Sequence, residues 1–171
     1  MGQKDEDKVM YVFYENPNKG FTVREISKIT KIPRATVHKK LLDLKKRNLV
    51  SKDNSSVDSL LFKTKKINYY LEKIVGSGLI DEIVEKLNPS CIILFGSIMK
   101  GDSVRESDID LFVESSVKDK PVELSGFEKK IGHEIQLFVE ESVSGMKAKN
   151  KNLLSNIING IKLYGVLDLK W

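Results

Sequence analysis

Apolar residues recur at helical spacing through the first 50 residues and predict three short helices. The first covers residues 7–15, and Pro17 and Gly20 interrupt the chain behind it. The second begins at Thr22, where Glu25 follows at the spacing of a capping box, a pair of side chains that satisfies two backbone N–H groups at a helix start. These signals predict a small helical module at the beginning of the chain.

The third helix starts just after Pro33 and turns Val37, Leu41 and Leu44 inward, while lysine and arginine cover much of its remaining surface. Residues 48–64 behind it predict a strand, a polar turn and a second strand. Two short helices joined by a tight turn, of which the second is rich in positive charge, are typical of a helix-turn-helix. The whole segment resembles the winged helix-turn-helix family of prokaryotic regulators, in which the third helix leads into a two-stranded wing.

The stretch that follows predicts two helices, interrupted by Gly-Ser-Gly at residues 76–78 and ended by Pro89. We expect the first of them, a linker helix over about residues 66–78, to carry the domain boundary. The chain would then consist of a winged helix-turn-helix domain, residues 1–66, and a second domain, residues 67–171.

The second domain contains an unusual segment, "CIILFGSIMKGDSVRESDIDLFVE", at residues 91–114. Its apolar start has the length of a buried strand, and Gly96 and Ser97 follow at the beginning of a short helix. Glycine lets the backbone approach a phosphate closely, serine offers a hydroxyl, and a helix start presents free N–H groups to an anion. The turn is therefore predicted to bind phosphate.

Asp108 and Asp110 alternate with apolar residues and are predicted to share one face of the next strand, about 6.5–7 Å apart at Cα. Burying two carboxylates is costly unless something pairs with them. Carboxylate oxygens suit Mg²⁺ bound together with substrate phosphates. We therefore predict a site for metal and phosphate at the mouth of this strand, with Asp108 and Asp110 as metal ligands.

Positive charge is concentrated in the first domain. Residues 1–65 hold 15 lysines and arginines against 8 acids, whereas residues 66–171 hold 14 against 16. A basic module favours duplex DNA as a partner, and the alternative is a solvated, lysine-rich face on a docking module. The residues predicted to face the major groove are Arg34, Thr36, His38, Lys39 and Lys40.

The sequence gives no sign of a membrane protein. No apolar run approaches the roughly 20 residues that span a bilayer. The N-terminus also lacks the apolar segment of a secretory signal. The single cysteine, Cys91, lies in an apolar run and is expected to be buried and inert. The cytoplasm is therefore the expected compartment.

Gly96-Ser97, ten intervening residues and Asp108-x-Asp110 resemble the signature of the DNA polymerase β-type nucleotidyltransferase superfamily, and in particular its small prokaryotic minimal nucleotidyltransferase branch. The resemblance covers about residues 79–165. It implies an α+β fold with a short mixed sheet flanked by helices. It also implies two Mg²⁺ ions and a nucleoside triphosphate, ATP or another, whose α-phosphate is attacked by an acceptor hydroxyl. The predicted nucleotide-binding residues are Gly96, Ser97 and Lys100, the last as a point charge where relatives often carry arginine.

The chain departs from the family pattern at the third carboxylate. The strand predicted over residues 133–141 places Gln136 where the family usually carries an acid. Glutamine has no charge and cannot act as a base. Glu134, two residues earlier on the same face, is the candidate replacement. The predicted catalytic residues are Asp108, Asp110 and Glu134.

Two main functions follow from these patterns. The first is an Mg²⁺-dependent nucleotidyltransferase whose acceptor, a protein or a nucleic acid, is selected by the winged helix. The second is a DNA-binding regulator whose degenerate nucleotidyltransferase domain only binds nucleotide. A scaffold without either activity is a third alternative, and the sequence leaves a homodimer open.

Overall fold

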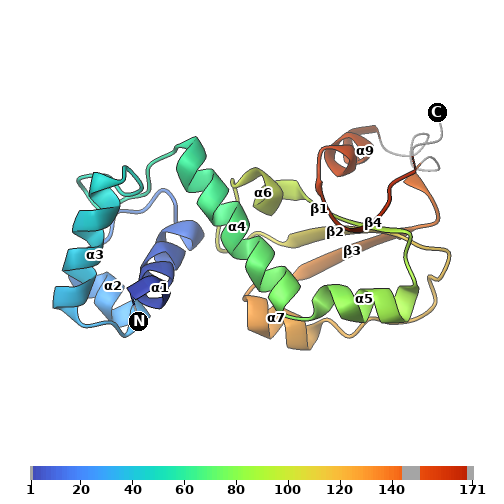
Figure 1. The fold of residues 1–171 in the computed structure, drawn as a ribbon, viewed down its shortest axis with the longest axis horizontal. Coiled ribbons are helices and arrows are strands. Elements are labelled where there is room, and N and C mark those ends of the chain that lie inside the picture. Colours follow the sequence, from blue (N-terminus) through green and yellow to red (C-terminus); the bar gives the residue numbers. More distant parts are fainter. Residues whose placement is uncertain (1, 144–150, 169–171) are drawn as a thin grey trace. The chain divides into compact units, whose positions relative to one another are not determined.

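The computed structural model describes residues 2–143 and 151–168 of the chain, which divides into two compact units (Figure 1). The first unit comprises the chain up to Lys66 together with Ser103–Arg105, and the second comprises the remainder. Each unit has its own set of buried apolar side chains.

Three helices build the first unit: α1 (Gly2–Glu15), α2 (Val23–Thr30) and α3 (Arg34–Lys46). The predicted capping box is present, because the Thr22 hydroxyl accepts a hydrogen bond from the Glu25 amide and the Glu25 carboxylate accepts one from the Thr22 amide. The three helices enclose an apolar core that includes Val9, Phe13, Ile26, Val37, Leu41 and Leu44.

The predicted wing is reduced, among the described residues, to a single bridge between Val50 and Ser56. The second strand expected within residues 48–64 was wrong, because α4 (Leu60–Gly76) begins there. Ser59 Oγ accepts a hydrogen bond from the Phe62 amide, and the Phe62 ring is buried, so this segment has a capped helix start. The first turns of α4 belong to the first unit and the rest of the helix belongs to the second.

The second unit holds a mixed sheet with the strand order β3-β2-β1-β4. Its strands are β1 (Cys91–Phe95), β2 (Ile109–Glu114), β3 (Ile135–Glu140) and β4 (Ile161–Gly165). Strand β1 runs antiparallel to β2 and β4, while β2 and β3 are parallel. The expectation of an α+β fold with a short mixed sheet is thus confirmed for this part of the chain.

Helices lie on both sides of the sheet (Figure 1). They are α5 (Leu79–Leu87), α6 (Gly96–Lys100), α7 (Ser125–Ile131) and α9 (Lys151–Ile158), besides the second part of α4. Helix α9 covers one face, where Ile157 packs in a cluster with Cys91, Ile93 and Phe112, and α5 and α7 lie on the opposite side. None of the described helices combines the length and the apolar character needed to cross a membrane.

Two strands begin later than their sequence patterns predict. Strand β2 starts at Ile109, so Asp108 is the last residue of the preceding loop. Strand β3 starts at Ile135, so Glu134 also lies just outside the sheet. Both acids therefore lie at the end of the β2–β3 ladder, whose first hydrogen bond runs from the Ile109 amide to the Glu134 carbonyl oxygen.

Candidate functional site

The turn between β1 and α6 brings the backbone close to a carboxylate. Gly96 has a φ of +76°, a conformation that glycine adopts without strain. A Cβ atom built on Gly96 would lie 1.9 Å from Asp110 Oδ2. Sheet register causes this proximity, because Phe95, the residue before the turn, pairs with Asp110 across the β1–β2 ladder. Glycine at this position therefore allows the Asp110 carboxylate to lie directly against the turn.

The two aspartates form a pair of like charges. Both side chains are half-buried. Burial raises the pKa of the Asp110 carboxyl above its usual value, and the nearby charge of Asp108 raises this pKa further. Such a pair is stabilised when a cation lies between the carboxylates. The chemistry of the two ligands and their mutual repulsion fit a divalent ion, with oxygen ligands that suit Mg²⁺.

Gln136 lies beside this pair. It is opposite Asp110 in the parallel β2–β3 ladder, and its side-chain amide donates a hydrogen bond to Asp108 Oδ2, 2.5 Å away. The site therefore has a neutral amide at the position where the sequence resemblance led us to expect a third acid. One oxygen of Asp108 is engaged by this amide.

Glu134, the predicted third carboxylate, is linked to the pair through its backbone and not through its side chain. The side chain of Glu134 is exposed, and its carbonyl oxygen accepts a hydrogen bond of 2.8 Å from the Ile109 amide. Within residues 2–143 and 151–168, no three side chains of His, Cys, Asp or Glu are grouped so that they could hold a metal ion together. A catalytic role of the Glu134 carboxylate stays a prediction.

The remaining predicted nucleotide-binding residues lie in α6. Ser97 is half-buried in its first turn, and Ile98 packs the helix onto the core. Lys100 is exposed at the end of α6, where its Nζ lies 3.2 Å from the side-chain oxygen of Asn156 in α9. Asn156 could not be recognised from the sequence as a neighbour of Lys100, because 56 residues separate the two.

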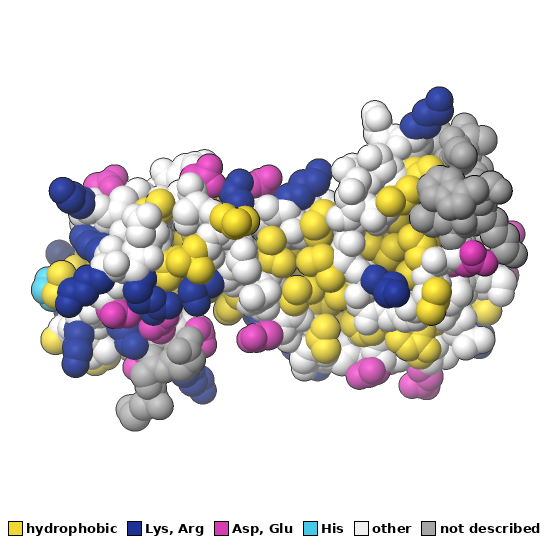
Figure 2. Space-filling model, turned by 45° about the horizontal axis from the view of Figure 1, so that its top comes forward, with side chains coloured by type: hydrophobic (Ala, Val, Ile, Leu, Met, Phe, Trp, Pro, Cys, Tyr) yellow, Lys and Arg dark blue, Asp and Glu magenta, His cyan; other side chains and the backbone are white. Residues whose placement is uncertain are grey.

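Basic side chains gather over the first unit on the face drawn in Figure 2. Of the residues predicted to contact DNA, Arg34, His38 and Lys39 are exposed on α3, and Thr36 is half-buried. Lys40 differs from these, because its Nζ lies 3.7 Å from a carboxylate oxygen of Glu6 in α1.

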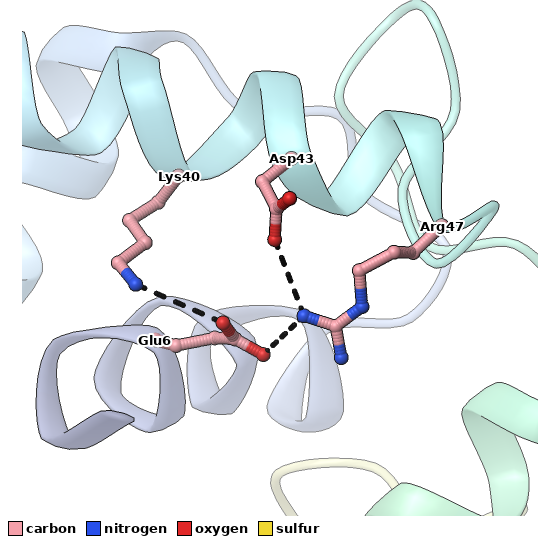
Figure 3. A network of polar contacts seen from close by, with 4 residues as sticks. All are labelled: Glu6, Lys40, Asp43 and Arg47. Carbon is pink, nitrogen blue, oxygen red and sulfur yellow. Dashed lines mark hydrogen bonds and ion pairs between the residues drawn. The ribbon is translucent and has the colours of Figure 1, made fainter. Parts of the chain in front are cut away.

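Lys40 belongs to a cluster of charges between α1 and α3 (Figure 3). Arg47 donates a hydrogen bond of 2.7 Å to Glu6, and the same nitrogen lies 3.3 Å from Asp43. These contacts raise the pKa of Arg47, with the hydrogen bond to Glu6 as the main cause. The Glu6 side chain is only 11% exposed, so the cluster joins the two helices at a partly desolvated position. Glu6 and Asp43 thus neutralise part of the positive charge on and next to α3.

Comparison with known protein families matches residues 79–166 to the family described as "Polymerase beta, Nucleotidyltransferase". This range is just over half of the chain and contains α6, the whole sheet, both aspartates and Gln136. Comparisons with curated proteins and with solved structures gave no match. Residues 1–66 of the first unit lie outside the matched range, and only its short segment Ser103–Arg105 falls within it. On the basis of the second unit, the chain belongs to the polymerase beta nucleotidyltransferase family.

Proposed function

We propose that this protein is an Mg²⁺-dependent nucleotidyltransferase that moves a nucleoside monophosphate from a nucleoside triphosphate, ATP in the simplest case, to an acceptor hydroxyl. The observation that carries the proposal is the contact between the Gly96 turn and the Asp110 carboxylate, with Asp108 beside it. This contact places a backbone that phosphate can approach next to two ligands for a divalent ion.

Each residue has a definite part in the proposed reaction. The phosphates lie against the backbone of Gly96 and the hydroxyl of Ser97, and Lys100 neutralises phosphate charge. Asp108 and Asp110 hold the metal. A bound divalent ion supplies charge neutralisation on the transferring group and helps activate the acceptor hydroxyl. The bond from the acceptor oxygen to the α-phosphorus would form as the bond to pyrophosphate breaks, and the hydroxyl proton would pass to the Glu134 carboxylate.

The number of oxygen ligands in the site limits the number of metal ions that it can hold. Two carboxylates and the phosphates of the substrate account for one ion. A second ion needs another ligand, and the candidates are the carbonyl oxygen of Gln136, after rotation of its amide, and the Glu134 carboxylate. Because only Glu134 carries a charge and can act as a base, full two-metal catalysis depends on that residue in our proposal.

The first unit is proposed to bind duplex DNA through α3, as in a winged helix-turn-helix. Support comes from the exposed Arg34, His38 and Lys39, which lie on the second of two short helices behind a capping box. The excess of basic residues in this half of the chain supports a polyanionic partner as well. DNA binding would bring the transferase to a nucleic-acid or protein acceptor.

Calorimetry with ATP tests the site. The wild type should bind ATP only with Mg²⁺ or Mn²⁺ present. D108N and D110N should each lower the affinity by at least about 10-fold, since each removes a metal ligand. D119N is the matched control, because Asp119 is an exposed acid in the loop after β2. Binding that ignores both the metal and the two substitutions would place the nucleotide elsewhere.

Transfer of label from the α-phosphate of ATP tests catalysis. E134Q should abolish transfer while leaving ATP binding intact if Glu134 acts as the third acid. Q136D should raise transfer, because it adds a charge at the position next to Asp110.

A regulator that only senses nucleotide is the second candidate, and the amide of Gln136 at the third ligand position favours it. It predicts metal-dependent ATP binding with no transfer to any acceptor, in the wild type and in E134Q alike. Transfer by the wild type would exclude it.

A further inference from the structure

A buried histidine lies behind the loop that carries Asp108. His133 is only 5% exposed and sits between α7 and β3. Its Nδ1 lies 2.6 Å from the carbonyl oxygen of Ser107, and its Nε2 lies 3.3 Å from the hydroxyl of Tyr70. The two rings meet edge to face, with centroids 5.1 Å apart. Tyr70 is fully buried in α4, so the histidine is held by packing as well as by hydrogen bonds.

The partners decide which ring nitrogen carries the proton. A carbonyl oxygen can only accept, so His133 Nδ1 must donate to Ser107. In the neutral imidazole, Nε2 then accepts from the Tyr70 hydroxyl. In this neutral form the hydrogen bonds run in one direction, from Tyr70 through His133 to the backbone of Ser107.

This chain of bonds ends next to a proposed metal ligand. Ser107 directly precedes Asp108, and the residue after Asp108, Ile109, donates its amide to the carbonyl of Glu134 at 2.8 Å. The two peptide groups that flank Asp108 are thus held by two consecutive residues, His133 and Glu134. Because Asp108 lies before the first residue of β2, the ladder reaches its backbone only through the Ile109 amide, and the Ser107–Asp108 peptide on the other side is held by His133.

We propose that His133 is a positioning residue for nucleotidyl transfer: together with Tyr70 it fixes the Ser107–Asp108 peptide, and thereby the direction in which the Asp108 carboxylate meets the metal. The proposal rests on the proposed function. The side chain touches neither substrate nor metal, and it acts through the backbone of the ligand.

Three substitutions in the full chain separate positioning from general stability. H133A removes the hydrogen bond to Ser107. H133N keeps an amide nitrogen near the place of Nδ1 and should restore that bond. Y70F removes only the hydroxyl that orients the imidazole and leaves the ring packing in place. Thermal unfolding of each variant reports whether it folds.

The first measurement is the Mg²⁺ concentration at which ATP binding is half-maximal. It should rise about 10-fold in H133A, the size expected when the support of a metal ligand is lost. It should rise about 2- to 3-fold in Y70F, in line with one indirect hydrogen bond, and return close to the wild-type value in H133N. The proposal would be overturned if H133A needed the same Mg²⁺ concentration as the wild type. It would also be overturned if H133N needed as high a concentration as H133A. If H133A does not fold, Y70F and H133N decide the question on the same criteria.

The second measurement is hydrogen exchange of the Ile109 amide without metal or nucleotide. Exchange should be faster in H133A and Y70F than in the wild type, and nearly normal in H133N. Unchanged exchange in H133A would show that His133 does not order this segment. If the wild type shows no metal-dependent ATP binding, the proposed function fails. Faster exchange in H133A would in that case still support His133 as the residue that orders Asp108.

Discussion

Gly96 satisfies two constraints at one residue. Its positive φ is costly for other residues, and any side chain would collide with Asp110. We predict that G96A lowers the free energy of unfolding by about 1–3 kcal/mol and abolishes detectable ATP binding, because the Asp110 carboxylate is displaced. Chemical denaturation and calorimetry measure the two effects.

Gly126 offers a matched control for this substitution. A Cβ atom on Gly126, in α7, meets no other atom within 4 Å. G126A should therefore leave ATP binding unchanged and keep or slightly raise stability, because alanine favours helix over glycine. Normal ATP binding by G96A would show that the turn is not part of the nucleotide site.

Asp110 ties stability to pH. The pKa of Asp110 is raised in the folded state, so its ionised carboxylate lowers the free energy of unfolding. This loss of stability is present above the folded-state pKa and disappears as the pH falls through that pKa. In the absence of metal, D110N should raise the melting temperature at pH 7 by about 1–3 °C, and the gain should vanish toward pH 4. Thermal unfolding in EDTA at both pH values checks this. A stability loss in D110N at pH 7, with D119N unchanged, would contradict it.

At the scale of elements, the charge cluster around Glu6 links α1 to α3. We predict that E6Q lowers stability by about 1 kcal/mol, because Arg47 and Lys40 lose their shared carboxylate at a partly desolvated position. If α3 binds DNA, E6Q should also raise DNA affinity, since the compensation of two positive charges is removed. Denaturation and fluorescence anisotropy with duplex DNA measure the two changes.

Lys39 provides the comparison for E6Q. It is exposed on the same helix, so K39A should weaken DNA binding with little change in stability. If both variants leave DNA affinity unaltered, the basic surface of α3 is a solvated face and not a DNA contact.

Elements whose formation depends on a few neighbouring residues could be predicted from the sequence. The capping box at Thr22 and the apolar run of β1 are examples, because each depends on neighbours in the chain. The wing could not be predicted in the same way. Leu60 and Leu61 are apolar, and their pattern predicted a strand. In the structure they are 83% and 50% exposed, because they lie on the solvent-facing side of the first turn of α4.

At the scale of the whole molecule, the two halves differ in charge and are proposed to bind different polyanions. DNA binding should weaken with a slope of about −3 in log affinity against log salt, since three or four exposed basic residues of α3 would contact phosphates. ATP binding should depend less on salt, because the metal neutralises the phosphates directly. Titrations of the full chain from low to physiological salt compare the two. DNA binding that does not change with salt would exclude a phosphate-contacting surface on α3.

The composition of the candidate site shows where prediction from the sequence ends. The spacing of Gly96, Asp108 and Asp110 predicted that a turn and two acids would meet, because β1 and β2 are consecutive strands. The bond between Gln136 and Asp108 joins residues 28 positions apart and depends on the parallel pairing of β2 with β3. Nor could the position of Asp108 before the start of β2 be predicted, since alternation of apolar and polar residues continues through it.

The hydrogen bond from Gln136 to Asp108 has a consequence for ion selectivity. While one oxygen of Asp108 accepts from the amide, the other oxygen is the better placed of the two for an ion, so Asp108 would bind a metal mainly through a single oxygen. Mg²⁺, with its small octahedral shell, is satisfied by single oxygens from carboxylates, whereas Ca²⁺ gains from carboxylates that bind through both oxygens. By holding one oxygen of Asp108, Gln136 would thus favour Mg²⁺ over Ca²⁺ in a cell where the two ions compete for the same carboxylates.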